Sequence, residues 1–324
     1  MRACAKHPFL PTGLAALLLL GAGAGCSLND DDDGGGASPL AGRIDVDGSS
    51  TVEPFTALAA ERFQNENPRV AVVVGVSPSR TGGGFERFCL GETDLSTASR
   101  RIEAEEEQAC RARGIEYFEF QVASDAVTVV VNPENDWVDC LTTGQLKEIW
   151  EPGSTVESWS QVSSRFPQEQ LELFGASETS GTFDYFTGEI VGEEGASRSD
   201  YAANEDDSVT AHAVAEARGG LGYFGLLYFS ENQDRLKALE IDGGSGCVGP
   251  SVEAVQSGEY TPLSRPLYVY ANKEALRQAS VRAFLKYALD NAISLAEEAL
   301  LVPVTDEQLQ REQAKFEQIQ DIRS

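Results

Sequence analysis

Three loops of this sequence combine glycine with serine or threonine directly before a stretch that favours a helix: Gly48–Thr51, Arg80–Gly84 and Glu178–Thr182. A helix N-terminus carries unpaired backbone N–H groups and a positive dipole end, so a small oxyanion placed there accepts several hydrogen bonds. Glycine lets the backbone approach closely, and hydroxyls add donors without adding charge. Any one such loop is more often a plain helix cap. Three in one chain predict an oxyanion-binding site.

The segments around these loops alternate between strand and helix patterns, as β-branched runs and apolar residues at helical spacing. We expect strands at residues 44–46, 69–76, 94–99, 117–121, 122–132, 171–174, 221–229 and 267–270, and helices at 52–65, 85–90, 103–113, 142–150, 182–191, 209–217, 273–300 and 305–322. Residues 262–266 mark a crossing segment between two of these parts. Such alternation predicts a parallel α/β sheet.

The N-terminus has the pattern of a bacterial export signal. Arg2 and Lys6 precede the apolar run Leu14–Leu20, and Gly21–Gly25 forms a small-residue stretch before Cys26. The apolar run is too short for a stable membrane span. We therefore expect residues 1–25 to be a lipoprotein signal peptide.

Cys26 follows the small residues as in a lipobox, which predicts that it is acylated and becomes the new N-terminus. The alternative is a soluble secreted protein cut near Ala24. Residues 26–42 contain Asp30–Asp33 and Gly34–Gly36 but few apolar side chains, so we interpret them as a solvated tether. The chain is expected to be exported and held on the membrane, facing the periplasm or the cell exterior, by its lipid alone.

The formal net charge is −27, and removing Arg2 and Lys6 with the leader gives −27 − 2 = −29. A protein this acidic repels nucleic acid and anionic lipid surfaces. Any anion site must therefore depend on local donors, which screening over about 10 Å permits.

Four cysteines remain after the leader and Cys26, and four cysteines permit three disulfide connectivities. Cys89–Cys110 with Cys140–Cys247 is favoured, because the first pair closes a local loop and the second joins two segments of one domain. Zinc binding is less favoured, since no CxxC spacing occurs and histidine is nearly absent.

Several motifs occur in one order along the chain: Gly48–Thr51, Thr81–Gly84, Asp94–Arg100, Ser180–Thr182 and Leu221–Phe224. This order resembles the phosphate-binding protein of the bacterial Pst importer, over nearly the whole mature chain. The most distinctive part is similar to a branch of that family in which SGTFDYF is followed by a serine–arginine pair, here Ser197 and Arg198.

The resemblance implies a periplasmic-binding-protein-like type II fold, with two α/β lobes joined by two crossover strands and a ligand cleft between them. Lobe 1 is expected at residues 43–121 and 264–324, and lobe 2 at 122–263. The family's role implies a monomeric extracytoplasmic solute-binding protein, not an enzyme, which captures inorganic phosphate and delivers it to the membrane subunits of an ABC importer. No cofactor or metal is implied.

By their positions in these motifs, Thr51 and Thr81 match the hydroxyl residues of the family's first two phosphate-binding loops. Ser180–Thr182 match the family's serine–glycine–threonine in the second lobe. The chain departs from the family where Ser99 replaces an aspartate and Ala176 replaces an arginine. The predicted phosphate ligands are Ser50, Thr51, Thr81, Ser99, Arg100, Ser180, Gly181, Thr182 and Arg198.

Arg100 and Arg198 are the candidates to supply the missing guanidinium, because its planar fork suits a tetrahedral oxyanion. The alternative for each is a surface ion pair in an acidic chain. The missing aspartate bears on selectivity, since a carboxylate acceptor distinguishes protonated phosphate from sulfate. Other acids could replace it, namely Glu178, Glu205, Asp206 and Asp207, although each also fits a solvated role.

Two other functions remain open. The same fold could bind sulfate, molybdate or a phosphonate instead. A secreted phosphate-ester hydrolase is disfavoured, because His212 is the single histidine beyond the leader and no G-x-S-x-G elbow or P-loop occurs.

Overall fold

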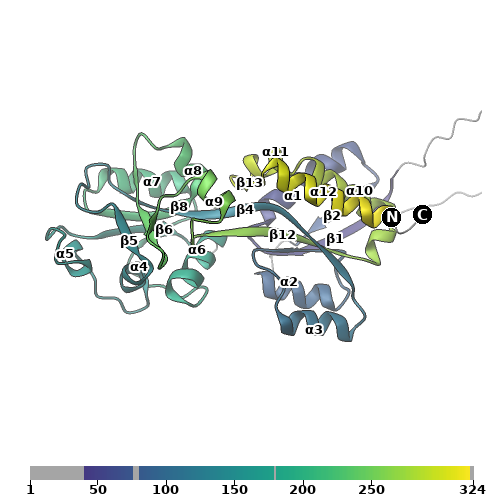
Figure 1. Cartoon of the computed structure of the whole chain (residues 1–324), viewed down its shortest axis with the longest axis horizontal. Coiled ribbons are helices and arrows are strands. Elements are labelled where there is room, and N and C mark those ends of the chain that lie inside the picture. The colour runs from purple at the N-terminus through teal and green to yellow at the C-terminus, as the bar shows by residue number, and fades with distance from the viewer. Residues whose placement is uncertain (1–39, 76–79, 179, 322–324) are drawn as a thin grey trace, which may run out of the picture. The chain divides into compact units, whose positions relative to one another are not determined.

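The computed structural model describes residues 40–75, 80–178 and 180–321 (Figure 1). The predicted signal peptide, Cys26 and nearly all of the tether lie outside these residues. Within them, no helix has the length and apolar character needed to cross a membrane.

The strands are β1 (Gly42–Gly48), β2 (Val70–Val74), β3 (Leu95–Ala98), β4 (Tyr117–Val131), β5 (Cys140–Thr142), β6 (Glu172–Ala176), β7 (Ala202–Asn204), β8 (Gly220–Gly225), β9 (Lys237–Ala238), β10 (Glu240–Asp242), β11 (Cys247–Val248), β12 (Ser264–Asn272) and β13 (Val302–Pro303). The helices are α1 (Glu53–Glu66), α2 (Arg80–Cys89), α3 (Ala104–Ala112), α4 (Thr143–Trp150), α5 (Trp159–Val162), α6 (Gly181–Phe186), the π-helix η1 (Thr187–Val191), α7 (Asp207–Glu216), α8 (Leu226–Glu231), α9 (Val252–Ser257), the 3-10 helix η2 (Ala275–Arg277), α10 (Ala279–Asp290), α11 (Ala292–Glu298) and α12 (Asp306–Asp321).

The main sheet has the strand order β2-β1-β3-β12-β4-β8-β6-β7. Strands β1, β2 and β3 pair in parallel, and so do β6, β7 and β8. Between these groups, β12 and β4 are antiparallel to each other and to β3 and β8 (Figure 1). The predicted parallel α/β sheet is therefore interrupted at its centre by two antiparallel strands.

Two large groups of buried apolar side chains lie along this sheet, and a third, smaller group joins α2, α3 and β12 through residues such as Phe85, Phe88 and Tyr270. The first core contains residues of β1, β3, β12, α1 and α10–α12, among them Ile44, Phe55, Phe63, Leu95, Phe120, Leu267, Phe284 and Phe316. The second core contains residues of β4, β6, β8 and α4–α6, among them Val127, Val129, Trp150, Trp159, Phe183, Phe186, Leu221 and Tyr223. Strand β4 contributes to both, because Phe120 and Val122 belong to the first core and Val127 and Val129 to the second.

Three element predictions were wrong in detail. Residues 117–132 form the one strand β4 rather than two, and the run at 221–229 divides into β8 and α8 because a buried apolar run alone does not distinguish a strand from a helix. The helix predicted at 273–300 is divided into η2, α10 and α11. Gln278 is extended between η2 and α10. Between α10 and α11 the side-chain amide of Asn291 donates to the carbonyl of Tyr287 at 2.8 Å and competes with the helix backbone.

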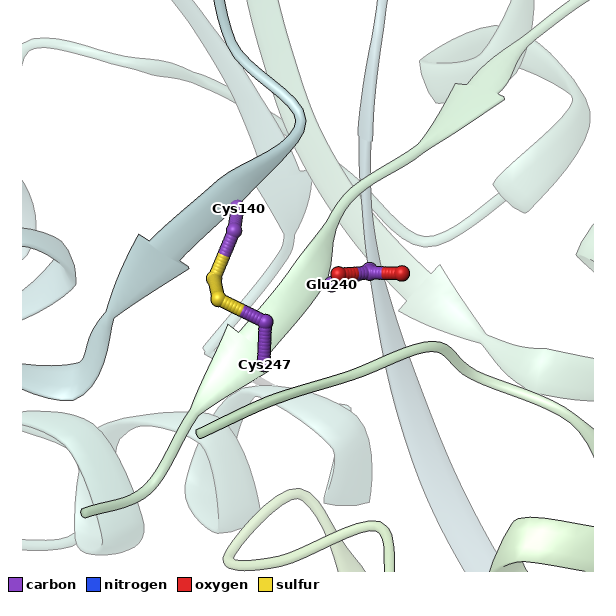
Figure 2. Close-up of side chains that lie close together, drawn as sticks. All are labelled: Cys140, Glu240 and Cys247. Carbon is purple, nitrogen blue, oxygen red and sulfur yellow. A yellow bond between two sulfur atoms is a disulfide. The ribbon is translucent and has the colours of Figure 1, made fainter. Parts of the chain in front are cut away.

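Both predicted disulfides are present, Cys89–Cys110 between α2 and α3 and Cys140–Cys247 between β5 and β11. They close sequence separations of 21 and 107 residues, for which the chain-entropy model gives about 3 and about 5 kcal/mol of stabilisation. Glu240 of β10 lies beside the second disulfide (Figure 2). Cys140, Glu240 and Cys247 bring their side-chain atoms within 4.8 Å of one another, but disulfide sulfurs are not thiolates, so the oxidised group lacks the ligands that a metal ion needs.

Candidate functional site

Arg265, on the central strand β12, brings together groups from both halves of the sheet. Its Nη1 donates to the Ser99 hydroxyl at 3.0 Å, and its Nη2 donates to the Thr51 hydroxyl at 2.7 Å. The same Nη2 lies 3.4 Å from the carbonyl oxygen of Gly181 and 3.3 Å from Oδ2 of Asp125. The side chain of Arg265 is only 12% exposed. A buried positive charge is thus held where hydroxyl-rich loops meet.

The guanidinium of Arg265 retains an unused donor. It lies 3.8 Å from the ring centroid of Tyr185, whose hydroxyl donates to the carbonyl of Pro262 at 2.5 Å. Among the described groups, Nε of Arg265 has no hydrogen-bond partner although it is buried. A buried unpaired donor costs free energy of about 1–3 kcal/mol, and more when charged, so an acceptor placed at Nε would be stabilised.

The first loop connects β1 to α1 and positions Thr51. Gly48 has a φ of +140°, and a Cβ there would lie 2.0 Å from the carbonyl oxygen of Thr97, so only glycine fits. The Ser49 amide donates to that carbonyl at 3.0 Å, and the Thr51 amide donates to the Ser49 hydroxyl at 3.3 Å. These local bonds turn the chain so that Thr51 meets Arg265.

Thr81 and Ser99 form a hydroxyl pair beside Arg265. Thr81 is in the first turn of α2 and Ser99 follows β3, and both are buried. Their hydroxyl oxygens are 3.1 Å apart, and the Ser99 amide also donates to the Thr81 hydroxyl at 3.1 Å. The predicted residues Thr51, Thr81 and Ser99 are therefore brought together around one guanidinium.

The loop that begins α6 contacts the first loop. Ser180 is the N-cap of α6, and its hydroxyl accepts from the Thr182 amide at 3.2 Å. A Cβ on Gly181 would lie 2.6 Å from the Thr51 hydroxyl oxygen and 3.1 Å from that of Ser50. The structure thus places Ser50, Gly181 and Thr51 in close contact, as the prediction of a shared site requires.

Asp125 of β4 supplies a carboxylate beside Arg265. It is buried, which raises the pKa of its carboxyl, while Arg265 and the Ala126 amide oppose the rise. Sequence reasoning missed both residues. A signal was present, because Asp125 is the single charged residue in the apolar run 122–132, and a charge at such a position is rarely unpaired.

The predicted roles of Arg100 and Arg198 are not supported by their contacts. Arg100 makes two 2.8 Å hydrogen bonds to Glu106 and pairs with Glu103 at 3.3 Å. The Arg100 guanidinium is therefore paired with acidic side chains, as its surface-pair alternative proposed, because a chain rich in carboxylates offers each arginine an acidic neighbour.

Arg198 is buried rather than exposed, and its side chain is 6% accessible. It pairs with both carboxylate oxygens of Asp200 at 2.6 and 2.8 Å, and its Nη1 donates to the carbonyls of Ile149 and Val156 at 3.1 and 2.9 Å. These bonds join the end of α4 to the segment before β7. In this structure the Arg198 side chain holds these segments together, and the guanidinium that contacts the hydroxyl cluster is that of Arg265.

Of the other candidate carboxylates, Asp206 caps α7 by accepting from the Ser208 amide at 2.8 Å, and Glu178 is exposed. Asp207 is partly buried in the first turn of α7. Burial raises the pKa of Asp207 to about 6, with smaller contributions from the charges of Asp206 and Asp125 and an opposing hydrogen bond from the Gly225 backbone.

This shift predicts a pH-dependent effect of Asp207→Asn on stability. Between pH 4 and 6 the folded chain holds a proton at Asp207 that the unfolded chain releases, so the carboxyl favours folding at low pH and loses that contribution as pH rises through about 6. At pH 7.5 the variant should be more stable by up to about 3 kcal/mol, and near pH 4 the difference should vanish. Urea unfolding at the two pH values measures this. A difference independent of pH would contradict it.

The site as a whole offers hydroxyls, backbone N–H groups, one buried guanidinium and one buried carboxylate. His212 lies apart from it on α7, exposed, with Nδ1 3.5 Å from Arg235. Such a set can desolvate and hold a small oxyanion but does not offer the nucleophile and base of a hydrolase. The fold and site define a substrate-binding protein of the periplasmic-binding-protein type.

Comparisons with known proteins agree with this class. A family model described as the PBP superfamily domain matches residues 34–292. Protein SphX of Synechococcus elongatus is 44% identical over 271 residues, which cover 83% of this chain and 79% of that protein. The phosphate-binding protein PstS of Staphylococcus saprophyticus is 36% identical over 313 residues, 96% of this chain and 94% of that protein. A crystal structure titled as a possible phosphate binding protein from Planctomyces limnophilus shares 43% identity and a TM-score of 0.83, covering 86% of this chain and 99% of that one.

The chain belongs to the PBP superfamily and, within it, to the family of phosphate-binding proteins named PstS. This family consists of extracytoplasmic substrate-binding proteins of ABC transporters and not of enzymes. The resemblance noted in the sequence is confirmed.

Proposed function

We propose that this chain captures inorganic phosphate at the cluster around Arg265 and delivers it to the membrane subunits of an ABC importer. The observation that carries the proposal is the buried guanidinium with an unused Nε donor, surrounded by the hydroxyls of Thr51 and Ser99. Relatives named phosphate-binding protein PstS support the choice of ligand.

The proposed ligands combine predicted and newly found residues. Hydroxyls and backbone N–H groups come from Ser50, Thr51, Thr81, Ser99 and Ser180–Thr182, and the charge comes from Arg265 in place of Arg100 and Arg198. We propose Asp125 as the acceptor that the sequence lacks at position 99, because its carboxylate already lies beside the guanidinium.

We further propose that the two cores are the two lobes of the binding protein. Lobe 1 comprises residues 43–121 and 264–324, and lobe 2 comprises 122–263. Along β4, Val122 belongs to the first core and Val127 to the second, which supports the boundary at residues 121–122. Leu263 belongs to the second core and Leu267 to the first, which supports the boundary at residues 263–264. We also propose that the chain is exported, acylated at Cys26 and monomeric. Export and acylation depend on the N-terminal sequence pattern, and the monomeric state depends on the role of the family.

Equilibrium titration of phosphate-free protein with phosphate and with sulfate tests the function. We expect tight phosphate binding and sulfate binding at least about tenfold weaker, since a site with a buried acceptor penalises an anion that has no proton to donate. Equal affinities would favour the alternative of another oxyanion, and absence of binding to either would reject the proposal.

Asp125→Asn should reduce this preference. The asparagine amide can donate to sulfate, so the ratio of sulfate to phosphate dissociation constants should fall by about tenfold, equivalent to about 1.4 kcal/mol. Asp200→Asn is a matched control, because that carboxylate pairs with an arginine outside the hydroxyl cluster. An unchanged ratio in Asp125→Asn would show that another group provides selectivity.

A further inference from the structure

An ion pair links the two lobes beside the proposed site. Nη2 of Arg80, the first residue of α2 in lobe 1, lies 3.0 Å from Oδ1 of Asp184 in the first turn of α6 in lobe 2. Nη1 of Arg80 also lies 4.0 Å from Glu194. The Arg80 side chain is 52% exposed and that of Asp184 is 13% exposed, so the pair lies at the edge of the contact between lobes.

Both members of the pair are held in costly states. Arg80 has a φ of +61°, a left-handed conformation that is unfavourable for a residue with a Cβ. Burial raises the pKa of Asp184, and the charge of Arg80 opposes the rise. Strained residues of this kind persist where surrounding contacts compensate for them, and they are common at clamps and switches.

The neighbours of the two residues connect the pair to the ligand groups. Thr81 directly follows Arg80, and Gly181 and Thr182 lie three and two residues before Asp184. The charge of Arg80 is directed to Asp184 rather than to the cluster around Arg265. Breaking the pair therefore removes an attraction between lobes without removing any of the proposed ligand groups.

We propose that Arg80 and Asp184 form a latch that holds the two lobes closed and slows the release of the bound anion, without contacting the anion. This inference rests on the proposed function and adds to it the residues that set residence time. A latch formed after the anion enters acts on the dissociation rate, whereas a ligand-attracting charge acts on the association rate.

Release of radiolabelled phosphate into excess unlabelled phosphate tests the latch. Arg80→Ala and Asp184→Asn should each speed release about two- to fivefold, the upper part of the range for a partly exposed pair, and change the association rate less than twofold. The two changes together should add little to either one, since they remove the same interaction. The charge swap Arg80→Asp with Asp184→Arg should recover part of the slow release.

Arg111→Ala is the matched control, because Arg111 forms a 3.0 Å pair with Glu107 inside α3 and spans no lobe contact. High salt should speed release from the wild type more than from Arg80→Ala, since the pair is screened. Release rates unchanged in both single variants would overturn the latch, and so would additive effects or a slower association in Arg80→Ala alone. Absence of phosphate binding by the wild type would overturn the proposed function and the latch with it.

Discussion

Arg265→Ala should abolish high-affinity phosphate binding, raising the dissociation constant by at least about a thousandfold. The variant loses charge-assisted hydrogen bonds, each of which contributes about 1.5–3 kcal/mol. It also leaves the Asp125 carboxylate buried without its partner, so we expect the free energy of unfolding to fall by about 3–5 kcal/mol. Phosphate titration and urea unfolding measure the two effects separately.

A folding defect alone could mimic the first effect, so Arg265→Ala should be combined with Asp125→Asn. The double variant removes the unpaired carboxylate and should recover stability while still failing to bind phosphate. Arg198→Lys provides the opposite control, because it breaks the planar pairing with Asp200 and should lower stability with affinity unchanged. Loss of affinity in Arg198→Lys with retention in Arg265→Ala would restore the ligand role predicted from the sequence.

Gly181→Ala should weaken phosphate binding by about ten- to a hundredfold by keeping the lobes apart. The added Cβ would lie 2.6 Å from the Thr51 hydroxyl oxygen, closer than Cβ atoms approach other heavy atoms, and 3.0 Å from the Thr51 amide nitrogen, which is a tight contact. A misplacement of about 1 Å in a preorganised site costs about a hundredfold in the extreme case. Titration with phosphate gives the affinity, and small-angle scattering with saturating phosphate reports whether the lobes close.

Gly144→Ala is the matched control, since Gly144 is also in the first turn of a helix but its Cβ position is 3.8 Å from the nearest atom. The free energy of unfolding of Gly181→Ala should change by less than about 1 kcal/mol, because alanine favours the helix as much as the new contact opposes it. Wild-type affinity in Gly181→Ala would show that the two loops do not approach each other when phosphate is bound.

The local features of the fold could be predicted from the sequence because short-range interactions determine them. Thr305 and Gln308, for example, form a capping box at the start of α12, with hydrogen bonds of 2.8 and 3.1 Å. The boundaries that failed, at Gly225 and Asn291, lie where burial on all sides or a single side-chain bond decides between conformations.

The sequence by itself determined the hydroxyl-rich loops of this protein, since glycine, serine and threonine before a helix specify a turn and a cap through contacts within a few residues. Only the tertiary structure decided which arginine joins them. Arg265 meets Thr51 and Asp125 across 214 and 140 residues of chain, while Arg100 and Arg198 are occupied by nearer acids. A long charged side chain pairs with the opposite charge that the fold brings within its reach. In so acidic a chain, which arginine contacts the hydroxyls therefore depends on burial and on the position of β4 and β12 in the sheet rather than on sequence spacing.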